Sequence, residues 1–374
     1  MCAMTRIPLH EKASLSPSTL LALKADIAVW ARELGFQQVG VSDIDLGEHP
    51  QHLARWLEQG YEAGMAWMHE PKRIAPAELV PNTQRIISLR MDYLPAEARI
   101  HEILGDADRA YIARYALGRD YHKLIRKRVQ KLADRMAEAI GPFGYRAFVD
   151  SAPVLEKAIA AQAGLGWAGK HTVIINRQAG SYFFLAELFT DLPLPVDEPV
   201  SSHCGTCSAC IDICPTQAII APYVLDAGKC ISYLTIEYRG VIAEPLRRAI
   251  GNRIFGCDDC QLVCPWNRYA QASQEPAFTP RHDFDGPPLL DLWAWDEITW
   301  LSKTEGMPLR RMSYASWLRN LSMALANAPA SADIVQALAM RRDELSASGM
   351  LNDVLTEHID WAINEQTLKL HAAQ

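Results

Sequence analysis

The chain has 374 residues, of which 49% are hydrophobic, and it carries a formal net charge of -7 with a pI of about 5.9. This length is enough for a buried core and suggests two or three domains. The acidic balance excludes a globally basic nucleic-acid binder but permits a local basic patch. No apolar run approaches the ~18 residues that span a bilayer, and the first residues show neither a signal-peptide core nor a twin arginine. We therefore expect a soluble, cytoplasmic protein without a membrane contact.

Residues 1–200 predict a mixed α/β domain. Ser16 is placed to cap a helix over 16–36 that has Pro17 at its first position. The apolar periodicity then indicates helices over 52–61, 120–140 and 154–166, and strands over 37–44, 85–94, 145–151, 171–176 and 181–189.

Residues 201–270 contain eight of the nine cysteines, from Cys204 to Cys264, whereas Cys2 has no evident role. In a cytosolic chain such a cluster favours metal binding over disulfides. Zinc held by two C-x2-C pairs is the main alternative. The run over 204–215, C-x2-C-x2-C-x3-C-P, has the spacing of bacterial ferredoxins, in which the fourth cysteine serves the other cluster. This spacing predicts two [4Fe–4S] clusters.

The second cysteine run, over 257–265, has only three cysteines, so Cys230 is needed to complete the count. An ordinary buried thiol is the alternative reading of Cys230. With the fourth cysteine of each run serving the other cluster, the ligands sort into two sets. The first set is Cys204, Cys207, Cys210 and Cys264, and the second is Cys214, Cys230, Cys257 and Cys260.

Residues 271–374 begin with a Pro-rich linker over 274–288 and continue into amphipathic helices. The helices are expected over 314–327, 332–345 and 351–368. They could form one or two helical-repeat units, although the sequence has no clear internal period.

Two short motifs resemble cofactor sites without the right context. The G-x-G-x-x-G match over 164–169, with Glu187 downstream, follows a helical pattern and precedes a strand, so we interpret it as a helix stop and tight turn. Asp120 and His122 begin a D-x-H pattern of cobalamin proteins, but Ile125 stands where that motif has glycine. We interpret this match as coincidence.

Asp150 and the helix over 120–140 each have two open interpretations. Asp150 ends an apolar strand, so it is either the N-cap of the next helix or a carboxyl group with a raised pKa that donates a proton. Arg126 and Lys127, with Arg128 and Lys131 beside them, form either a solvated face or a phosphate contact.

The segments 204–219, 223–240 and 251–267 resemble the epoxyqueuosine reductase family. The segments 113–129, 149–176, 180–194 and 312–329 match the same family. The resemblance therefore extends over nearly the whole chain.

The resemblance implies an α+β fold of three units. These are a mixed α/β, nitroreductase-like cobalamin domain over 1–200, a ferredoxin-like two-cluster domain over 201–270, and a linker with HEAT-like helices over 271–374. It also implies reduction of epoxyqueuosine to queuosine at the wobble position of a tRNA anticodon, by cob(I)alamin fed by two [4Fe–4S] clusters. A reductive dehalogenase-like enzyme and a non-enzymatic electron-transfer protein remain as alternatives.

The resemblance also implies residue roles, with Asp150 as proton donor. Arg239 stands where lysine is frequent and would contact cofactor or tRNA phosphate, and Ala113 stands where some relatives have cysteine and would only pack. The expected partners are tRNA, bound also by Arg126 and Lys127, and an unidentified low-potential electron donor, with the chain acting as a monomer. The implied cobalamin contacts are Arg73, Ala113, Asp150, His171, Ile174, Leu185, Ser232 and Asp258.

Overall fold

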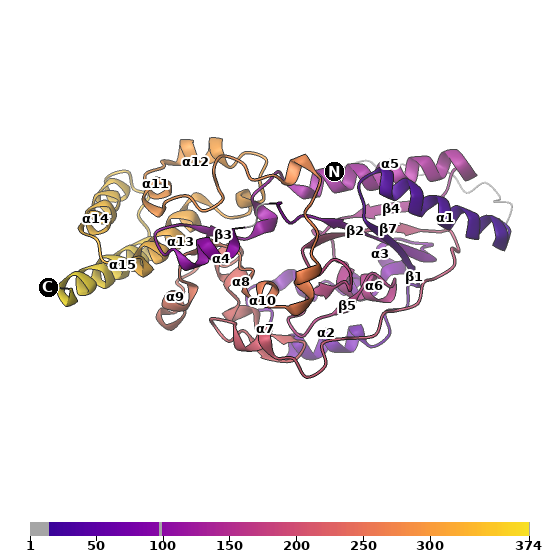
Figure 1. Cartoon of the computed structure of the whole chain (residues 1–374), viewed down its shortest axis with the longest axis horizontal. Helices are drawn as coiled ribbons and strands as arrows, with labels where there is room; N and C mark the ends of the chain where they lie inside the picture. Colours follow the sequence, from indigo (N-terminus) through magenta and orange to yellow (C-terminus); the bar gives the residue numbers. More distant parts are fainter. Residues whose placement is uncertain (1–14, 97–98, 374) are drawn as a thin grey trace.

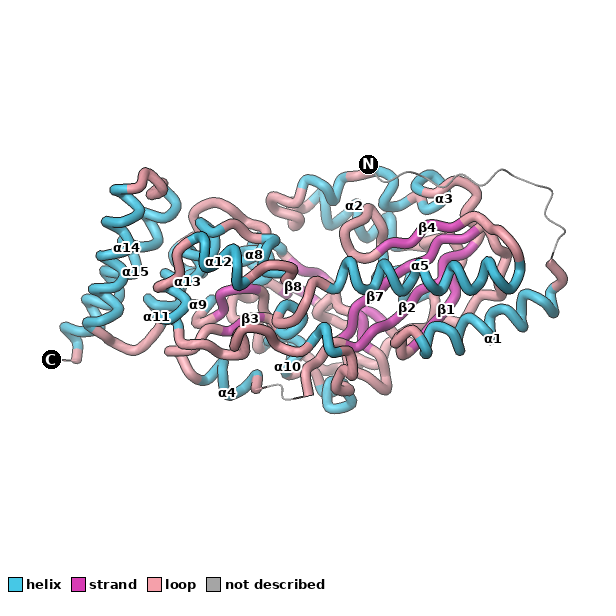
Figure 2. Tube along the Cα trace, turned by 90° about the horizontal axis from the view of Figure 1, so that it is seen from above, coloured by secondary structure: helices cyan, strands magenta, loops and turns pink. Residues whose placement is uncertain are grey.

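The computed structural model describes residues 15–96 and 99–373, so Cys2 lies outside the described residues. The molecule is elongated, with a β-sheet at one end and the C-terminal helices at the other (Figures 1 and 2). The cysteine-rich segment lies between them, below the middle of the view in Figure 1. The predicted α+β class is confirmed.

The N-terminal half is organised by a four-stranded sheet in the order β1–β2–β7–β4, in which all neighbours are antiparallel. Its strands are β1 (Gln38–Ser42), β2 (Arg85–Asp92), β7 (Phe183–Thr190) and β4 (Tyr145–Phe148). The central strands β2 and β7 are buried almost throughout, which explains their continuous apolar runs.

The expected strand over 171–176 is reduced to a two-residue strand outside this sheet. β6 (Ile174–Ile175) pairs only with β5 (Trp167–Ala168). The helix before it ends at Gln162, and Gly164 has φ +74°, a conformation that favours glycine. The predicted helix stop and tight turn at 164–169 is therefore confirmed.

Helices cover both faces of the sheet. α1 (Pro17–Glu33) and α5 (Tyr121–Ile140) pack together on one face, and α6 (Glu156–Gln162) packs on the other (Figure 1). The Ser16 hydroxyl accepts a hydrogen bond from the Thr19 amide at 3.1 Å, as expected for the cap of α1. The buried stripe of α1 repeats every three or four residues and faces the core.

The remaining elements of the first 270 residues are short. Some of them follow the strands of the sheet and others lie within the cysteine-rich segment, where β10 (Arg253–Phe255) pairs in parallel with β3 (Tyr111–Ile112). The helices are α2 (His49–Glu58), α3 (Pro76–Leu79), α4 (Ile100–Gly105), α7 (Ala209–Asp212), α8 (Ile231–Ile236), α9 (Glu244–Ile250) and α10 (Asp259–Leu262). The strands are β3 (Tyr111–Ile112), β8 (Ile219–Ala221), β9 (Val224–Leu225) and β10 (Arg253–Phe255).

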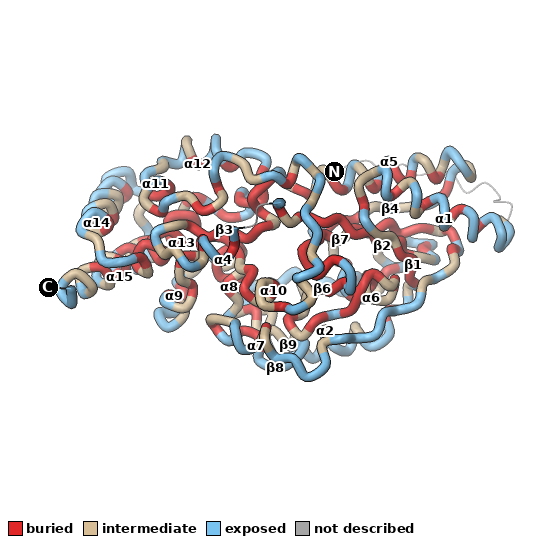
Figure 3. The backbone as a smooth tube through the Cα atoms, in the orientation of Figure 1, coloured by how far each residue is buried: buried red, intermediate tan, exposed pale blue. Residues whose placement is uncertain are grey.

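The C-terminal helices pack around α13, which is buried over most of its length (Figure 3). The Arg319 guanidinium in α13 donates to the Leu234 carbonyl at 2.7 Å, and the Asn320 amide donates to the Ile254 carbonyl at 2.9 Å. These bonds tie α13 to the cysteine-rich segment. The helices are α11 (Leu289–Trp293), α12 (Glu297–Lys303), α13 (Tyr314–Asn327), α14 (Ala332–Ala347) and α15 (Asp353–Ala372).

The Pro-rich stretch over 274–288 is packed against the rest of the molecule. Phe278 lies in the core beside α5, and Phe284 lies in the core around α13. Within 15–96 and 99–373, none of the helices has the length and apolar character to cross a membrane.

Candidate active site

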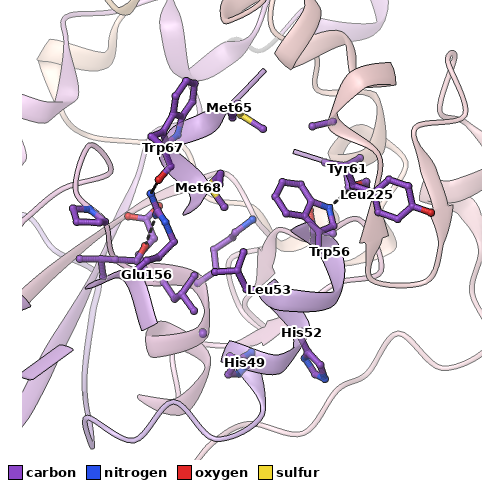
Figure 4. Close-up of a pocket in the computed structure, with 18 of the residues that line it drawn as sticks. His49, His52, Leu53, Trp56, Tyr61, Met65, Trp67, Met68, Glu156 and Leu225 are labelled. Atoms are coloured by element: carbon purple, nitrogen blue, oxygen red, sulfur yellow. Dashed lines mark hydrogen bonds between the residues drawn. The ribbon is translucent and has the colours of Figure 1, made fainter. Parts of the chain in front are cut away.

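A cavity of about 1630 Å³ opens beside the sheet, between α2, residues 65–73 and residues 150–158. Figure 4 places Trp67, Met68 and Glu156 on one wall, and Trp56 and Leu225 on the opposite wall. The Trp56 indole donates to the Leu225 carbonyl at 2.7 Å, which joins α2 to β9. Pockets for drug-sized ligands measure about 300–1,000 Å³, so this cavity suits a larger molecule.

Asp150 lies on the cavity wall in the loop between β4 and α6. Its φ of +54° is uncommon for a residue other than glycine, and such strain often marks functional loops. One carboxylate oxygen, Oδ2, accepts a hydrogen bond from the Tyr121 hydroxyl at 2.6 Å and lies 3.0 Å from His122 Nε2. The N-cap of α6 is Leu155, so the interpretation of Asp150 as a helix cap is wrong.

The partners of Asp150 are held by the start of α5. Asp120 caps this helix by accepting from the His122 amide at 3.0 Å, and its carboxylate also lies 2.7 Å from His122 Nδ1. The Tyr121 ring stacks on Phe184 of β7 with ring centroids 3.8 Å apart. The packing of α5 on the sheet therefore aims both Tyr121 and His122 at Asp150.

The pKa of Asp150 is shifted in the direction opposite to the one expected from the sequence. Burial raises it, but hydrogen bonds from His122 and Tyr121 and the charge of His122 outweigh burial, so the pKa is lowered. Burial lowers the pKa of His122, yet its bonds to Asp120 and Asp150 raise it to about 9. At neutral pH the pair thus holds its proton on His122. The prediction of a raised Asp150 pKa was wrong because it considered burial alone.

Among the other ionisable residues that line the same cavity are Glu156, Lys157 and Arg311. Burial, followed by the charge of Asp150, raises the pKa of Glu156 to about 8. Burial lowers the pKa of Lys157. The Arg311 guanidinium donates to the Glu237 carboxylate at 2.6 Å.

Of the residues expected to contact cobalamin, Arg73 and Asp150 line the cavity. The Arg73 guanidinium donates to the Trp67 carbonyl at 3.1 Å, while its Nε finds no partner among the described residues. The lining does not include the six others, Ala113, His171, Ile174, Leu185, Ser232 and Asp258.

His171 is buried immediately behind the lining residues Gly169 and Thr172. Its Nδ1 accepts from the Val173 amide at 3.1 Å, and its buried Nε2 has no partner in the described part of the chain. Burial lowers the pKa of His171 to about 4, so the ring is neutral and Nε2 carries the hydrogen. Buried donors without partners, here and at Arg73, fit a cofactor that carries amide and phosphate acceptors, as cobalamin does.

Four of the remaining residues expected to contact cobalamin are buried or hydrogen-bonded within the protein. Asp258 is buried, and its Oδ2 accepts from the Tyr111 hydroxyl at 2.5 Å and the Arg114 amide at 2.8 Å. Ser232 lies in α8, where it hydrogen-bonds the Cys230 thiol. Ala113 and Ile174 are buried.

The cysteines expected to bind the first cluster lie near one another. Burial raises the pKa of Cys210, and the neighbouring thiols of Cys264, Cys204 and Cys207 add to this effect. Lys170 supports the loop, because its ammonium group donates to the carbonyls of Gly205 at 2.7 Å and Cys207 at 2.8 Å.

Three cysteines of the second set also lie together. After burial, the thiols of Cys230, Cys210 and Cys214 contribute to the raised pKa of Cys260, so the two sets are neighbours. The fourth, Cys257, donates to the Asp259 carboxylate at 2.8 Å and packs against the same core as Cys230. In the described ranges, no three His, Cys, Asp or Glu side chains are arranged to hold one single metal ion.

The basic residues of α5 divide into two kinds. Arg126 and Lys127 are exposed and make no ion pair with any described residue, whereas Arg128 is held by Glu275 and the Leu34 carbonyl. Arg126 follows His122 by one helical turn and shares its face. Arg239 donates to the Ile236 carbonyl at 2.6 Å and the Arg311 carbonyl at 2.8 Å, so it supports Arg311.

Sequence reasoning missed His122, Tyr121, Glu156 and Arg311. The D-x-H pattern at the start of α5 was a usable signal for His122, but it was compared only with a different cobalamin motif. No local pattern could have indicated Arg311, because it reaches the cavity from a segment about 160 residues after Asp150.

A large cavity beside paired acid and base groups, next to a segment with eight clustered cysteines, defines an iron–sulfur oxidoreductase. Residues 73–151 match the family model "Epoxyqueuosine reductase QueG, DUF1730", and residues 203–267 match "4Fe-4S double cluster binding domain". The chain is 58% identical over 363 residues to the epoxyqueuosine reductase of Pseudomonas aeruginosa, covering 96% of this chain and 98% of the relative. The chain therefore belongs to the epoxyqueuosine reductase family and is a reductase.

Two solved structures support this assignment. One is an epoxyqueuosine reductase with a tRNA-Tyr epoxyqueuosine-modified stem loop, at 28% identity and a TM-score of 0.79, covering 94% of this chain and 93% of that one. The other is the Bacillus subtilis epoxyqueuosine reductase with its aspartate catalytic loop swung out of the active site, at 27% identity, TM-score 0.78 and 94% coverage of both chains. These matches favour the reductase over a dehalogenase-like enzyme or an electron-transfer protein.

Proposed function

We propose that the chain reduces epoxyqueuosine to queuosine in the wobble position of a tRNA anticodon. The observation that carries this proposal is the Asp150 carboxylate on the wall of a cavity of about 1630 Å³, paired with His122 at 3.0 Å. Its supports are the family membership and the solved relative bound to a modified tRNA stem loop.

Cobalamin and two [4Fe–4S] clusters are the proposed cofactors. When bound, they supply the two electrons of the reduction. Arg73 and His171 would hold acceptor groups of cobalamin with their unpartnered nitrogens. Ala113, Ile174, Leu185, Ser232 and Asp258 stay proposed contacts on the family resemblance.

We propose the cluster ligands in two sets. Cys204, Cys207, Cys210 and Cys264 form the first set, and Cys214, Cys230, Cys257 and Cys260 form the second. The electrostatic coupling of the thiols within each set supports the assignment for seven of them. For Cys257 the support is the cysteine spacing and its place beside Cys230.

His122 and Asp150 act as one proton-donating unit. His122 stores the proton, and Asp150 lies between it and the cavity, so a proton can pass through the 3.0 Å contact to the leaving oxygen. The strained φ of Asp150 supports the proposal that its loop can move, as the catalytic loop of the Bacillus subtilis relative does.

The exposed residues Arg126 and Lys127 would contact tRNA phosphates. Both residues follow His122 along α5, so the bound tRNA backbone would extend away from the cavity along this helix. We assign Arg239 a supporting role, because it holds the backbone of Arg311.

The chain would act in the cytoplasm as a monomer with a low-potential electron donor. The division into 1–200, 201–270 and 271–374 is proposed on the family resemblance. The core shared by Ile112, Ile254 and Trp317 supports close packing between these units.

The test is an anaerobic reaction of the reconstituted protein with tRNA that contains epoxyqueuosine, followed by nucleoside analysis. Formation of queuosine by the wild type, and its loss in Asp150→Asn, is the expected result. Unchanged epoxyqueuosine in a reaction with protein that holds both clusters and cobalamin would overturn the proposal.

A further inference from the structure

The proposed reduction consumes two protons as well as two electrons. Both carbon–oxygen bonds of the epoxide break, a carbon–carbon double bond forms, and the oxygen leaves as water. A low-potential one-electron donor supplies the electrons through the clusters. In the His122–Asp150 pair at neutral pH, Asp150 is ionised and His122 is protonated, so the pair can supply one proton. A second acid in the same cavity would complete the balance.

We propose that Glu156 is this second acid and donates the proton that turns the leaving oxygen into water; the inference rests on the proposed function. Glu156 is the first residue of α6 and lines the cavity six residues after Asp150. Its carboxyl group accepts a hydrogen bond from the Asp150 backbone amide. In Figure 4 its side chain lies on the wall that also carries Trp67 and Met68.

The surroundings of Glu156 keep it protonated at neutral pH. Burial and then the negative charge of Asp150 raise its pKa to about 8, against the opposing charges of Lys157 and His122. The other groups that face it are Arg73 from the segment before α3, Tyr121 from α5, Glu187 from β7 and, within its own helix, Lys157.

Glu187 is not an equivalent donor. Its side chain is fully buried, and it does not line the cavity. Both of its carboxylate oxygens lack a partner among the described residues, and burial raises its pKa well above the ordinary value. Glu156 is therefore the protonated carboxyl group that a substrate in the cavity can reach.

The competing explanation is that Glu156 only stabilises the N-terminus of α6. An acidic residue in the first turn does this when it is ionised, because it interacts with the helix dipole. The two explanations differ in the protonation state of the carboxyl group, which infrared spectroscopy measures directly without cofactor or substrate.

The first test is a pH titration by infrared spectroscopy of the full chain. We expect one component of the protonated-carboxyl band to disappear near pH 8 in the wild type. This titrating component should be absent in Glu156→Gln, whereas the component of Glu187, whose pKa is raised well above the ordinary value, should remain in both. Glu138→Gln, the same change at an exposed position of α5, should keep the titrating component. A wild type without a carboxyl group that titrates in this range would overturn the inference, even if Glu156→Gln does not fold.

The second test measures single-turnover rates of pre-reduced holoenzyme as a function of pH. An acid acts only while protonated, so the wild-type rate should fall as pH rises through about 8, and Glu156→Gln should lose this limb and react at least roughly a hundredfold more slowly. If the wild type forms queuosine and Glu156→Gln is equally fast, the inference fails while the proposed function stands. A wild type that forms no queuosine contradicts the proposed function instead.

Discussion

Replacing Asp150 with Asn tests whether the Asp150 carboxylate keeps His122 protonated by raising its pKa. Asn keeps the shape and tolerates the positive φ of this position, but it removes the charge 3.0 Å from Nε2. Two carboxylates, Asp120 at 2.7 Å and Asp150 at 3.0 Å, raise the pKa of His122 from 6.5 to about 9. Losing one of two similar partners should lower it to roughly 8.

The assay is an NMR titration of the His122 ring in the chain without substrate. At pH 8 the protonated fraction of His122 should fall from about nine-tenths to about one-half. Single-turnover reduction should slow at least roughly a hundredfold in the same variant. Asp343→Asn, at an exposed position in α14, is the matched control and should change neither quantity. A His122 pKa that stays near 9 in Asp150→Asn would refute the reasoning.

The same pair predicts how stability depends on pH. The folded-state pKa of His122 is raised above 6.5, so its stabilising contribution is fully present below about pH 6.5 and is lost as pH rises through about 9. Denaturant unfolding of the wild type and His122→Gln should therefore differ most below pH 6.5 and converge at high pH. A difference that is constant with pH would contradict this origin of the stability.

Three further predictions follow from single features of the fold. Cys230→Ala should reduce the iron content from about eight to about four per chain, and retention of all iron would refute the ligand assignment. Changing Arg126 and Lys127 to Glu should weaken tRNA binding and leave the cobalamin spectra unchanged. The slope of the logarithm of the binding constant against the logarithm of the salt concentration should become shallower by about one unit per lost contact. An unchanged affinity would show that these two residues form only a solvated face. Arg319→Ala removes bonds from a buried guanidinium to three carbonyl groups and should lower the free energy of unfolding by roughly 3 kcal/mol. Arg342→Ala, which removes a half-exposed ion pair with Asp360, should cost about 0–1 kcal/mol in the same denaturant titration.

The sequence alone was sufficient where the signal is local. The cap at Ser16, the helix stop near Gly164 and the long apolar runs of β2 and β7 depend on neighbouring residues, and the structure contains all of them. The cysteine spacing is also local, because ligand geometry constrains how many residues lie between successive thiolates. The family resemblance supplied the activity and cofactors through these same contiguous segments.

Only the tertiary structure decided the chemistry of the cavity. The pKa of Asp150 depends on Tyr121 and His122, which are 29 and 28 residues away in sequence and reach it because α5 packs on the sheet. Burial alone would raise this pKa, whereas hydrogen bonds to the charged form lower it, and sequence shows only the first effect. Arg311 arrives from the C-terminal third for the same reason. Protonation states in this cavity are a property of groups that meet only after folding.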